Sequence, residues 1–214
     1  MKTSALPLVL LGAGGHSRVL VALARAAGYP MLGVCDSILA EKKVAIWEDL
    51  EVLGDDCALD LLDPGSVALM LGVGQLVGDN LRMQIYASWR ARGYTFPTLI
   101  HPNTWIAPGV VLNDGVQVMA GAVIQPRCEI GENSIVNTRV GIDHDCRIGC
   151  NVHLAPGVTL CGSVTIEDEA FIGAGATVIQ GVRVGRNAVV GAGVTLVRDL
   201  KSKMTIIGSA NRLR

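Results

Sequence analysis

His144 lies between two aspartates, Asp143 and Asp145, in a segment that otherwise holds aliphatic, glycine and small residues. A neutral imidazole, with an ordinary pKa of about 6.5, can accept a proton near neutral pH. A carboxylate bonded to the other ring nitrogen would fix the tautomer and stabilise the cation that forms. A base held in this way typically contributes on the order of 10²–10⁴-fold to a rate. His144 is therefore a candidate general base, and either aspartate could orient it. The competing interpretation is a solvated surface histidine.

A second motif, Gly12-Ala13-Gly14-Gly15-His16, follows a short apolar run near the N-terminus. Glycines let backbone N–H groups approach a phosphate at a helix N-terminus, where the helix dipole favours anions. The motif departs from the dinucleotide fingerprint G-x-G-x-x-G, because Ser17 stands where the third glycine would be. By itself it is a weak indication of NAD binding, and a Rossmann-like fold without a ligand is the alternative.

The first half of the chain must position this glycine motif. Strands are expected at 7–11, 31–34 and 67–73, and helices at 17–27 and 79–92. Gly28 and Gly93 end the two helices. Strands that alternate with helices predict a small parallel α/β sheet, so residues 1–97 are expected to form a Rossmann-like domain.

The second half has a different period. From Ile100 to Leu196 every sixth residue is Ile, Leu or Val, and the residue three places later is often Gly or Asn. Gly and Asn tolerate left-handed backbone conformations, which indicates a turn there. Such hexapeptide repeats predict a parallel β-helix over residues 98–214, ending in a C-terminal tail. Three repeats, or about 18 residues, close one coil, so residues 18 apart should stack. A sandwich would instead show alternation of period two.

The composition agrees with a regular aliphatic core. Of the 214 residues, 50% are hydrophobic but only 4% are aromatic, and 26 are glycine. The formal net charge is −1 without long charged runs, so neither nucleic acid nor a membrane surface is expected as a partner. The six cysteines form no C-x-x-C pair and are expected to be buried, reduced thiols. The start, MKTSALPLVLLGAGG, superficially resembles a signal peptide, but its apolar run is short, so a cytoplasmic location is expected.

The hexapeptide repeat, the Gly-Ala-Gly-Gly-His motif and the junction Leu99-Ile100-His101-Pro102 together resemble the bacterial nucleotide-sugar N-acetyltransferases of the hexapeptide-repeat acyltransferase family. This group includes N-acetyltransferases of amino-dideoxysugars such as perosamine, for glycan, O-antigen and lipopolysaccharide biosynthesis, and related sialic acid O-acetyltransferases. The resemblance implies a left-handed β-helix, acetyl-CoA as co-substrate, no metal, and a homotrimer with each site between two subunits.

The resemblance also implies roles for particular residues of the β-helix. VGIDHDCRIG matches the family's base at His144, with the adjacent acidic residue at Asp145. Gly162, which lies 18 residues after His144, matches the glycine whose N–H points at the thioester oxygen. His153 matches a position near the thioester, and Ala174 and Ala192 match positions along coenzyme A; Pro156 continues that line of small residues.

For the N-terminal domain the resemblance implies binding of a nucleotide sugar. The pyrophosphate is expected near Gly14, Gly15 and His16, and the nucleoside near Asp36 and Ser37. Gly74 and Arg82, in and after the loop that follows the third strand, are further candidates for substrate contact. In the tail, Arg212 is a candidate phosphate contact, although the family's Gly-x-Pro-Ala-Lys ending is altered here to Gly208-Ser209-Ala210-Asn211-Arg212.

The expected function is acetyl-CoA-dependent N-acetylation of a nucleotide-linked 4-amino-4,6-dideoxysugar by direct attack of the amine, with His144 as base. The alternative at the same site is O-acetylation of a sialic acid or related sugar. A γ-type carbonic anhydrase would need three histidines on zinc, whereas the repeats hold only His144 and His153, with His101 at their start. A non-enzymatic NAD-binding or scaffold role is the remaining alternative. The sequence leaves the nucleotide (GDP, UDP or dTDP) and the sugar open.

Overall fold

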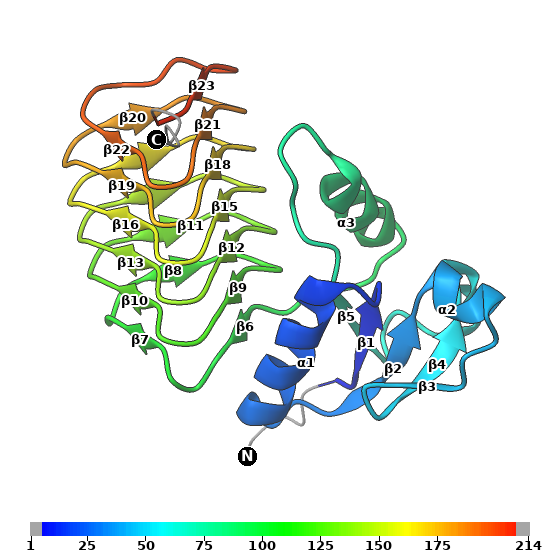
Figure 1. Ribbon diagram of the computed structural model, residues 1–214. Coiled ribbons are helices and arrows are strands. Elements are labelled where there is room, and N and C mark those ends of the chain that lie inside the picture. Colours follow the sequence, from blue (N-terminus) through cyan, green and yellow to red (C-terminus); the bar gives the residue numbers. More distant parts are fainter. Residues whose placement is uncertain (1–5, 209–214) are drawn as a thin grey trace, which may run out of the picture. The chain divides into compact units, whose positions relative to one another are not determined.

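The computed structural model describes residues 6–208 of the chain (Figure 1). The chain divides into two compact units, Met1–Pro102 and Asn103–Arg214. Each unit has its own pattern of elements and is described separately below. Among the helices within residues 6–208, none is long and apolar enough to cross a bilayer.

The N-terminal unit is built on a five-stranded sheet in the order β3-β4-β2-β1-β5. The pairings of β1 with β2 and β5, and of β2 with β4, are parallel, and only β3 runs antiparallel to its neighbour. The strands are β1 (Leu8–Leu11), β2 (Met31–Cys35), β3 (Ile46–Trp47), β4 (Leu50–Gly54) and β5 (Ala68–Leu71), and β6 (Leu99–Ile100) follows at the end of the unit. The helices are α1 (Gly15–Ala27), α2 (Ser37–Glu41), the 3₁₀ helix η1 (Asp56–Leu61) and α3 (Leu81–Ala91).

The predicted strands and helices of this unit are present, and a segment that the sequence did not predict completes the sheet. β1 is buried at all four positions, as expected for a central parallel strand covered on both faces. α1 begins two residues before the predicted start and ends at Gly28, which has a φ of +74°. The unpredicted segment is α2 to η1; its strands are short and partly exposed, so they carry little apolar periodicity.

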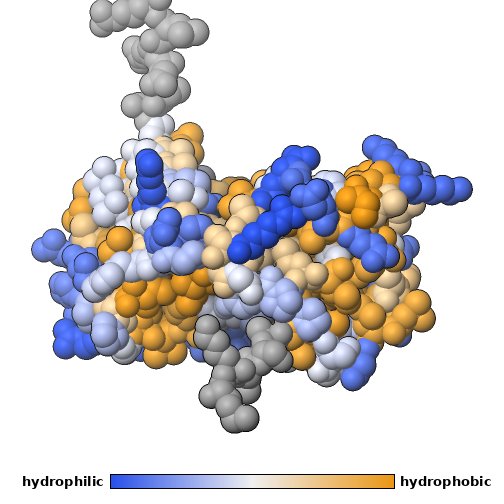
Figure 2. Space-filling view, turned by 90° about the horizontal axis from the view of Figure 1, so that it is seen from below, coloured by the Kyte–Doolittle hydropathy of each residue, from blue (hydrophilic) through white to orange (hydrophobic). Residues whose placement is uncertain are grey.

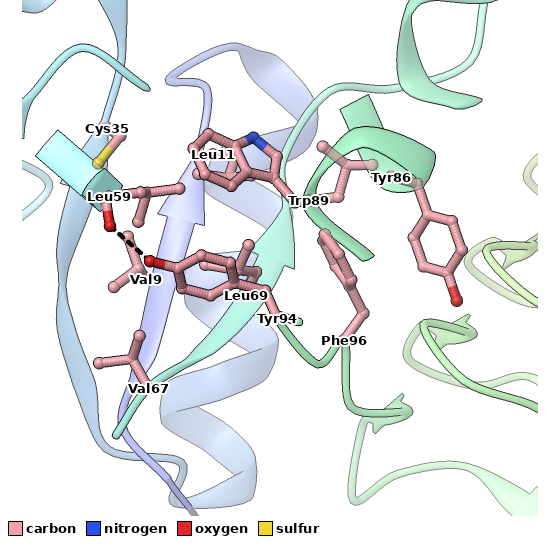
Figure 3. Packing of buried hydrophobic residues seen from close by; sticks show 11 residues of the cluster. Val9, Leu11, Cys35, Leu59, Val67, Leu69, Tyr86, Trp89, Tyr94 and Phe96 are labelled. Carbon is pink, nitrogen blue, oxygen red and sulfur yellow. Dashed lines mark hydrogen bonds between the residues drawn. The ribbon is translucent and has the colours of Figure 1, made fainter. Parts of the chain in front are cut away.

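Aromatic side chains pack on one face of this sheet (Figure 3). Trp89 of α3 lies edge-on to Tyr94, with ring centroids 5.3 Å apart, and Tyr86 lies 4.7 Å from Phe96. The Tyr94 hydroxyl donates to the Leu59 carbonyl at 2.5 Å, which satisfies its polar end inside the core. This cluster fixes α3 against β5 and so places the loop between them.

The C-terminal unit is a three-sided parallel β-helix whose two-residue strands stack in three sheets. The first face holds β7 (Trp105–Ile106), β10 (Val123–Ile124), β13 (Gly141–Ile142), β16 (Thr159–Leu160), β19 (Thr177–Val178) and β22 (Thr195–Leu196). The second face holds β8 (Val111–Leu112), β11 (Glu129–Ile130), β14 (Arg147–Ile148), β17 (Thr165–Ile166) and β20 (Arg183–Val184). The third face holds β9 (Gln117–Val118), β12 (Ile135–Val136), β15 (His153–Leu154), β18 (Phe171–Ile172), β21 (Val189–Val190) and β23 (Thr205–Ile206).

The register of the β-helix is the one the hexapeptide period predicts. Ile124 pairs with Ile142 and Ile142 with Leu160, so equivalent residues of successive coils stack, and all three are buried. The coil continues past Leu196, where the repeat ends in the sequence, because β23 adds a further strand to the third face.

The turns of the β-helix are left-handed at the predicted place, but not only at Gly and Asn. Charged and hydroxyl side chains also adopt positive φ there, including Arg127 (+60°), Asp145 (+61°) and Ser163 (+60°). A non-glycine residue in this region is uncommon. Backbone bonds between coils hold these turns, such as Asp145 N–H to the Pro126 carbonyl at 3.1 Å.

Candidate active site

His144 and Asp145 lie at the corner between the first and second faces, in the turn after β13. The imidazole Nδ1 is 2.6 Å from Oδ2 of Asp145. The backbone of His144 is fixed by the next coil, because the Ser163 N–H donates to the His144 carbonyl at 2.8 Å. The ring Nε2 makes no hydrogen bond within the described part of the chain, and the side chain is 54% exposed. A neutral ring with its proton on Nδ1 therefore presents the Nε2 lone pair outward.

The other aspartate, Asp143, has a different role. Its Oδ1 accepts the backbone N–H of the next residue, His144, at 2.8 Å, so this carboxylate is bonded to the backbone rather than to the imidazole. Of the two carboxylates that flank His144, Asp145 is thus the one on Nδ1.

Asp145 is held from the preceding coil by Arg127, a residue that the sequence analysis did not single out. Arg127 Nε lies 2.6 Å from Oδ1 of Asp145, and its Nη2 donates to Oδ2 at 3.1 Å. The two residues occupy the same turn position one coil apart, which the stacking rule could have revealed.

These contacts shift both pKa values. The hydrogen bond that the imidazole donates to Asp145 raises the pKa of His144 above its ordinary value, with a smaller contribution from the charge of Asp143, while burial and Arg127 oppose the increase. The Arg127 hydrogen bond, followed by that of His144, lowers the pKa of Asp145. Asp145 is therefore ionised at neutral pH, and His144 loses its proton at a higher pH than an isolated histidine would.

Gly162, one coil after His144, stacks against the ring of His144, as the spacing of 18 predicts. A Cβ at position 162 would lie 2.7 Å from Cε1 and 2.8 Å from Nε2 of His144. Gly162 is buried, so a glycine is required there to make room for the imidazole. The predicted role of its N–H as an oxyanion donor stays a prediction.

The predicted cofactor residues lie elsewhere on the prism. Pro156, Ala174 and Ala192 stack, exposed, along the corner between the third and first faces. His153 lies on the third face in β15, buried, with its ring centroid 4.9 Å from that of Phe171 and its Nε2 3.5 Å from Asn137 Nδ2. A single chain therefore brings His144, Asp145 and Gly162 together but places the row of small residues on another edge.

In the N-terminal unit the glycine motif lies where the strand order reverses. The chain passes from β1 to β2 on one side and returns to β5 on the other, and ligands of open α/β sheets bind at such a point, beyond the carboxyl ends of the strands. Ser17, buried in α1, brings its Oγ to 2.7 Å from the Gly12 carbonyl and 3.1 Å from the Gly72 carbonyl, and so clamps the two turns together. This contact explains the serine in the third-glycine position.

The substrate candidates of this unit lie around that point. Gly14 is the N-cap of α1 and has no side-chain cap, and a Cβ on Gly14 or Gly15 would meet nothing within 4 Å. Gly74 lies beside the first turn of α1, since a Cβ there would be 3.6 Å from His16 Cβ. Gly14 and Gly15 are exposed, so a ligand can approach the backbone at the start of α1, where the helix dipole favours an anion.

Three further candidates have partners within the protein. Asp36 accepts the Ala13 N–H at 2.9 Å and the Leu39 N–H at 2.9 Å, so its carboxylate holds the glycine turn and caps α2, whose first residue is the exposed Ser37. Arg82 is buried, and its Nη1 donates to the carbonyls of Leu71 (3.0 Å) and Val73 (2.7 Å). Burial lowers the pKa of the Arg82 guanidinium to about 9. This arrangement braces the end of β5, and a substrate contact by Arg82 stays a prediction.

The remaining sequence expectations have mixed outcomes. All six cysteines are free, but Cys57 is exposed and Cys150 and Cys161 are only half-buried, so the prediction that the thiols are buried is wrong for these three. No group of three or more His, Cys, Asp or Glu side chains within residues 6–208 is placed to hold a metal ion. Arg212 lies outside the described residues.

An imidazole–carboxylate pair on the corner of a hexapeptide β-helix, together with a Rossmann-like unit, defines the class of hexapeptide-repeat acyltransferases. Comparison with known proteins agrees. Residues 145–180 match the family model of the bacterial transferase hexapeptide (six repeats), residues 163–198 that of the hexapeptide repeat of succinyl-transferase, and residues 7–88 that of the PglD N-terminal domain. The chain belongs to the bacterial nucleotide-sugar N-acetyltransferases of this class. The family and the fold class, including the left-handed β-helix, are thereby confirmed.

The solved relatives cover nearly the whole chain. PerB from Caulobacter crescentus, in complex with CoA and GDP-perosamine, is 35% identical over 94% of each chain, with a TM-score of 0.86. The acetyltransferase domain of PglB from Neisseria gonorrhoeae, in complex with acetyl coenzyme A, is 33% identical over 95% of this chain and 97% of that one, with a TM-score of 0.87. The GDP-perosamine N-acetyltransferase of Escherichia coli O157:H7 is 33% identical over 147 residues, which is 64% of this chain and 59% of that protein's length.

Proposed function

We propose that the chain is an acetyl-CoA-dependent N-acetyltransferase that acts on the amino group of a nucleotide-linked 4-amino-4,6-dideoxysugar, as a cytoplasmic homotrimer. The observation that carries this proposal is the imidazole of His144, which is bonded through Nδ1 to Asp145 and is half-exposed, with no hydrogen bond at Nε2 within the described residues. Perosamine is such a sugar, and relatives that cover most of the chain are named for it or bind GDP-perosamine, which supports this substrate class.

The chemistry needs few groups. The amine nitrogen attacks the thioester carbon of acetyl-CoA, a C–N bond forms, the C–S bond breaks, and coenzyme A leaves. Nε2 of His144 accepts the proton that the amine loses and returns it to the departing thiolate. Asp145 stabilises the imidazolium in between, because its carboxylate stays ionised. The Gly162 N–H is the proposed donor to the oxyanion.

We propose that a second copy of the chain completes the acetyl-CoA site. The row of Pro156, Ala174 and Ala192 and the imidazole of His144 lie at opposite edges of the first face. One side of the prism holds six residues, a span of up to about 20 Å. The cofactor could lie along the row of one copy while its thioester meets His144 of another, and small side chains leave room for the pantetheine arm. This arrangement agrees with the homotrimer that the family resemblance implies.

The outer surface of the first face suits a contact between copies better than that of the second face. Its outward strand positions carry no charge: Trp105, Val123, Gly141, Thr159, Thr177 and Thr195. The outward positions of the second face include Glu129, Arg147 and Arg183, which suit solvent. Trp105 is 51% exposed and Val123 39%, and apolar surface is visible from below in Figure 2. Interface cores are depleted of charged residues and enriched in aromatic ones.

The N-terminal unit is proposed to bind the nucleotide sugar. The uncapped start of α1 with Gly14, Gly15 and His16 would hold the pyrophosphate, and Ser37 and Gly74 lie on the segments that border it. We assign Asp36 and Arg82 mainly to holding these segments, given their contacts within the protein.

The test is a direct assay for the acetylated product. The purified protein is incubated with acetyl-CoA and, in parallel, with GDP-perosamine, other nucleotide-linked amino-dideoxysugars and sialic acid, and the products are identified by mass spectrometry. The proposal expects an amide on the nucleotide-linked amino sugar and stoichiometric release of free CoA thiol. Acetylation of hydroxyl acceptors alone, or no CoA release with any acceptor, would overturn it.

A further inference from the structure

The carboxylate of Asp145 contacts two side chains. One is the proposed base His144, and the other is Arg127, whose guanidinium contacts both carboxylate oxygens. A two-point contact of this kind fixes the plane of the carboxylate, which a single hydrogen bond would leave free to rotate. The orientation of the imidazole therefore depends on Arg127 through the carboxylate of Asp145.

The β-helix register brings Arg127 to this place. The turn positions along the corner are Gly109, Arg127, Asp145, Ser163 and Gly181, and their φ values run from +60° to +83°. Residues one coil apart stack, so the backbone repeat itself places the cation of Arg127 next to the anion of Asp145. Pro126, beside Arg127, accepts the Asp145 N–H at 3.1 Å, which locks the two turns together.

The contact is not explained by stability alone. Arg127 is 77% exposed, and exposed ion pairs contribute little to folding. A similar exposed pair, Arg183 with Glu167 at 2.6 Å, lies elsewhere on the β-helix and involves no histidine. The pair at Asp145 differs because its carboxylate also accepts from an imidazole.

We propose that Arg127 is a positioning residue of the active site, which holds the Asp145 carboxylate in the plane that keeps the proton of neutral His144 on Nδ1 and leaves Nε2 as the proton acceptor. The effect on turnover rests on the proposed function, whereas the effect on the histidine does not. The charged groups that face the ring are Asp145, Asp143 and Arg127, and removal of the last also removes a charge that lowers the pKa of His144. The test must therefore separate orientation from charge.

The first measurement is independent of activity. Nitrogen-15 NMR of the imidazole, recorded on the full-length protein above the pKa of His144, reports which ring nitrogen carries the proton. Wild type is expected to show the Nδ1–H tautomer, and Arg127→Gln a mixture of both tautomers, with Arg183→Gln unchanged as the matched control. Should Arg127→Gln fail to fold, Arg127→Asn replaces it, since asparagine tolerates the left-handed backbone. Identical spectra for wild type and the folded Arg127 variant would overturn the proposal.

The second measurement is a double-mutant cycle on kcat at saturating substrates. Arg127→Gln is expected to lower kcat about tenfold, in the range seen when partners behind a functional side chain are removed. In the background of Asp145→Asn the same change should alter kcat less than twofold, because Arg127 acts through that carboxylate. An equal loss in both backgrounds would contradict the proposal. If His144→Ala keeps full activity, the proposed function fails instead, and the NMR comparison still decides the role of Arg127.

Discussion

Replacement of Gly162 by alanine tests the site through the room that His144 needs. The new Cβ would lie 2.7 Å from Cε1, 2.8 Å from Nε2 and 3.3 Å from Nδ1 of the imidazole. Carbon atoms in ordinary contact are about 3.5 Å apart or more, so the ring must move by roughly 0.8 Å. The ring is at the exposed end of a flexible side chain and can swing away, but it then leaves its 2.6 Å contact with Asp145.

The size of the effect follows from the role of a positioned base. A general base contributes on the order of 10²–10⁴-fold, and a misplacement of about 1 Å can cost about 10²-fold. We therefore expect Gly162→Ala to lower kcat about 100-fold. The fold should be little affected, because the backbone at position 162 does not have a positive φ and alanine is then no more strained than glycine.

The assay measures CoA thiol release at saturating acetyl-CoA and nucleotide amino sugar, alongside thermal unfolding of each variant. The matched control is the same replacement in a His144→Ala background, where the alanine has no ring to displace and should change kcat less than twofold. A kcat for Gly162→Ala within threefold of wild type, in a folded protein, would show that the imidazole does not act from its place against Gly162.

Three other predictions follow from the geometry. The pKa of His144 is raised, and the neutral base is lost as the pH falls below that raised value, so kcat/KM should rise with pH to a plateau. Asp145→Asn removes the main cause of the raised pKa and should move the rising part of this profile to lower pH. A profile that stays in place would argue against the pairing of His144 with Asp145. Gly72→Ala should lower the free energy of unfolding of the N-terminal unit by about 2–3 kcal/mol in urea, because the new Cβ would lie 2.3 Å from the buried Ser17 Oγ. An unchanged midpoint of urea unfolding would contradict this packing. Mixed trimers of His144→Ala and Ala174→Trp chains, each inactive alone, should regain activity if the site lies between copies, and mixtures that stay inactive would count against that arrangement.

The β-helix was predictable from the sequence because its information is local and repeated. An aliphatic residue at every sixth position fixes the strand, the face and the register at once, and the stacking of His144 on Gly162 then follows from a spacing of 18. The contact between Arg127 and Asp145 obeys the same rule. Residue type alone does not predict it, because turns of this kind favour Gly and Asn, whereas here backbone hydrogen bonds between coils let charged residues occupy them.

The N-terminal unit was less predictable, because its contacts join distant segments. The strands β3 and β4 are short and half-exposed, so neither has a clear period. The family resemblance implies a substrate contact for Arg82, which stays a prediction. In the structure tertiary packing buries the guanidinium against carbonyls at the end of β5, which no local pattern reveals.

In the proposed reaction the imidazole at the corner of the β-helix takes the proton from the attacking amine. This role is tested by kcat and KM of His144→Ala, with binding of acetyl-CoA checked by calorimetry. We expect a kcat lower by about 10²–10⁴-fold, with the affinity for acetyl-CoA retained. Turnover close to that of the unaltered protein would contradict it.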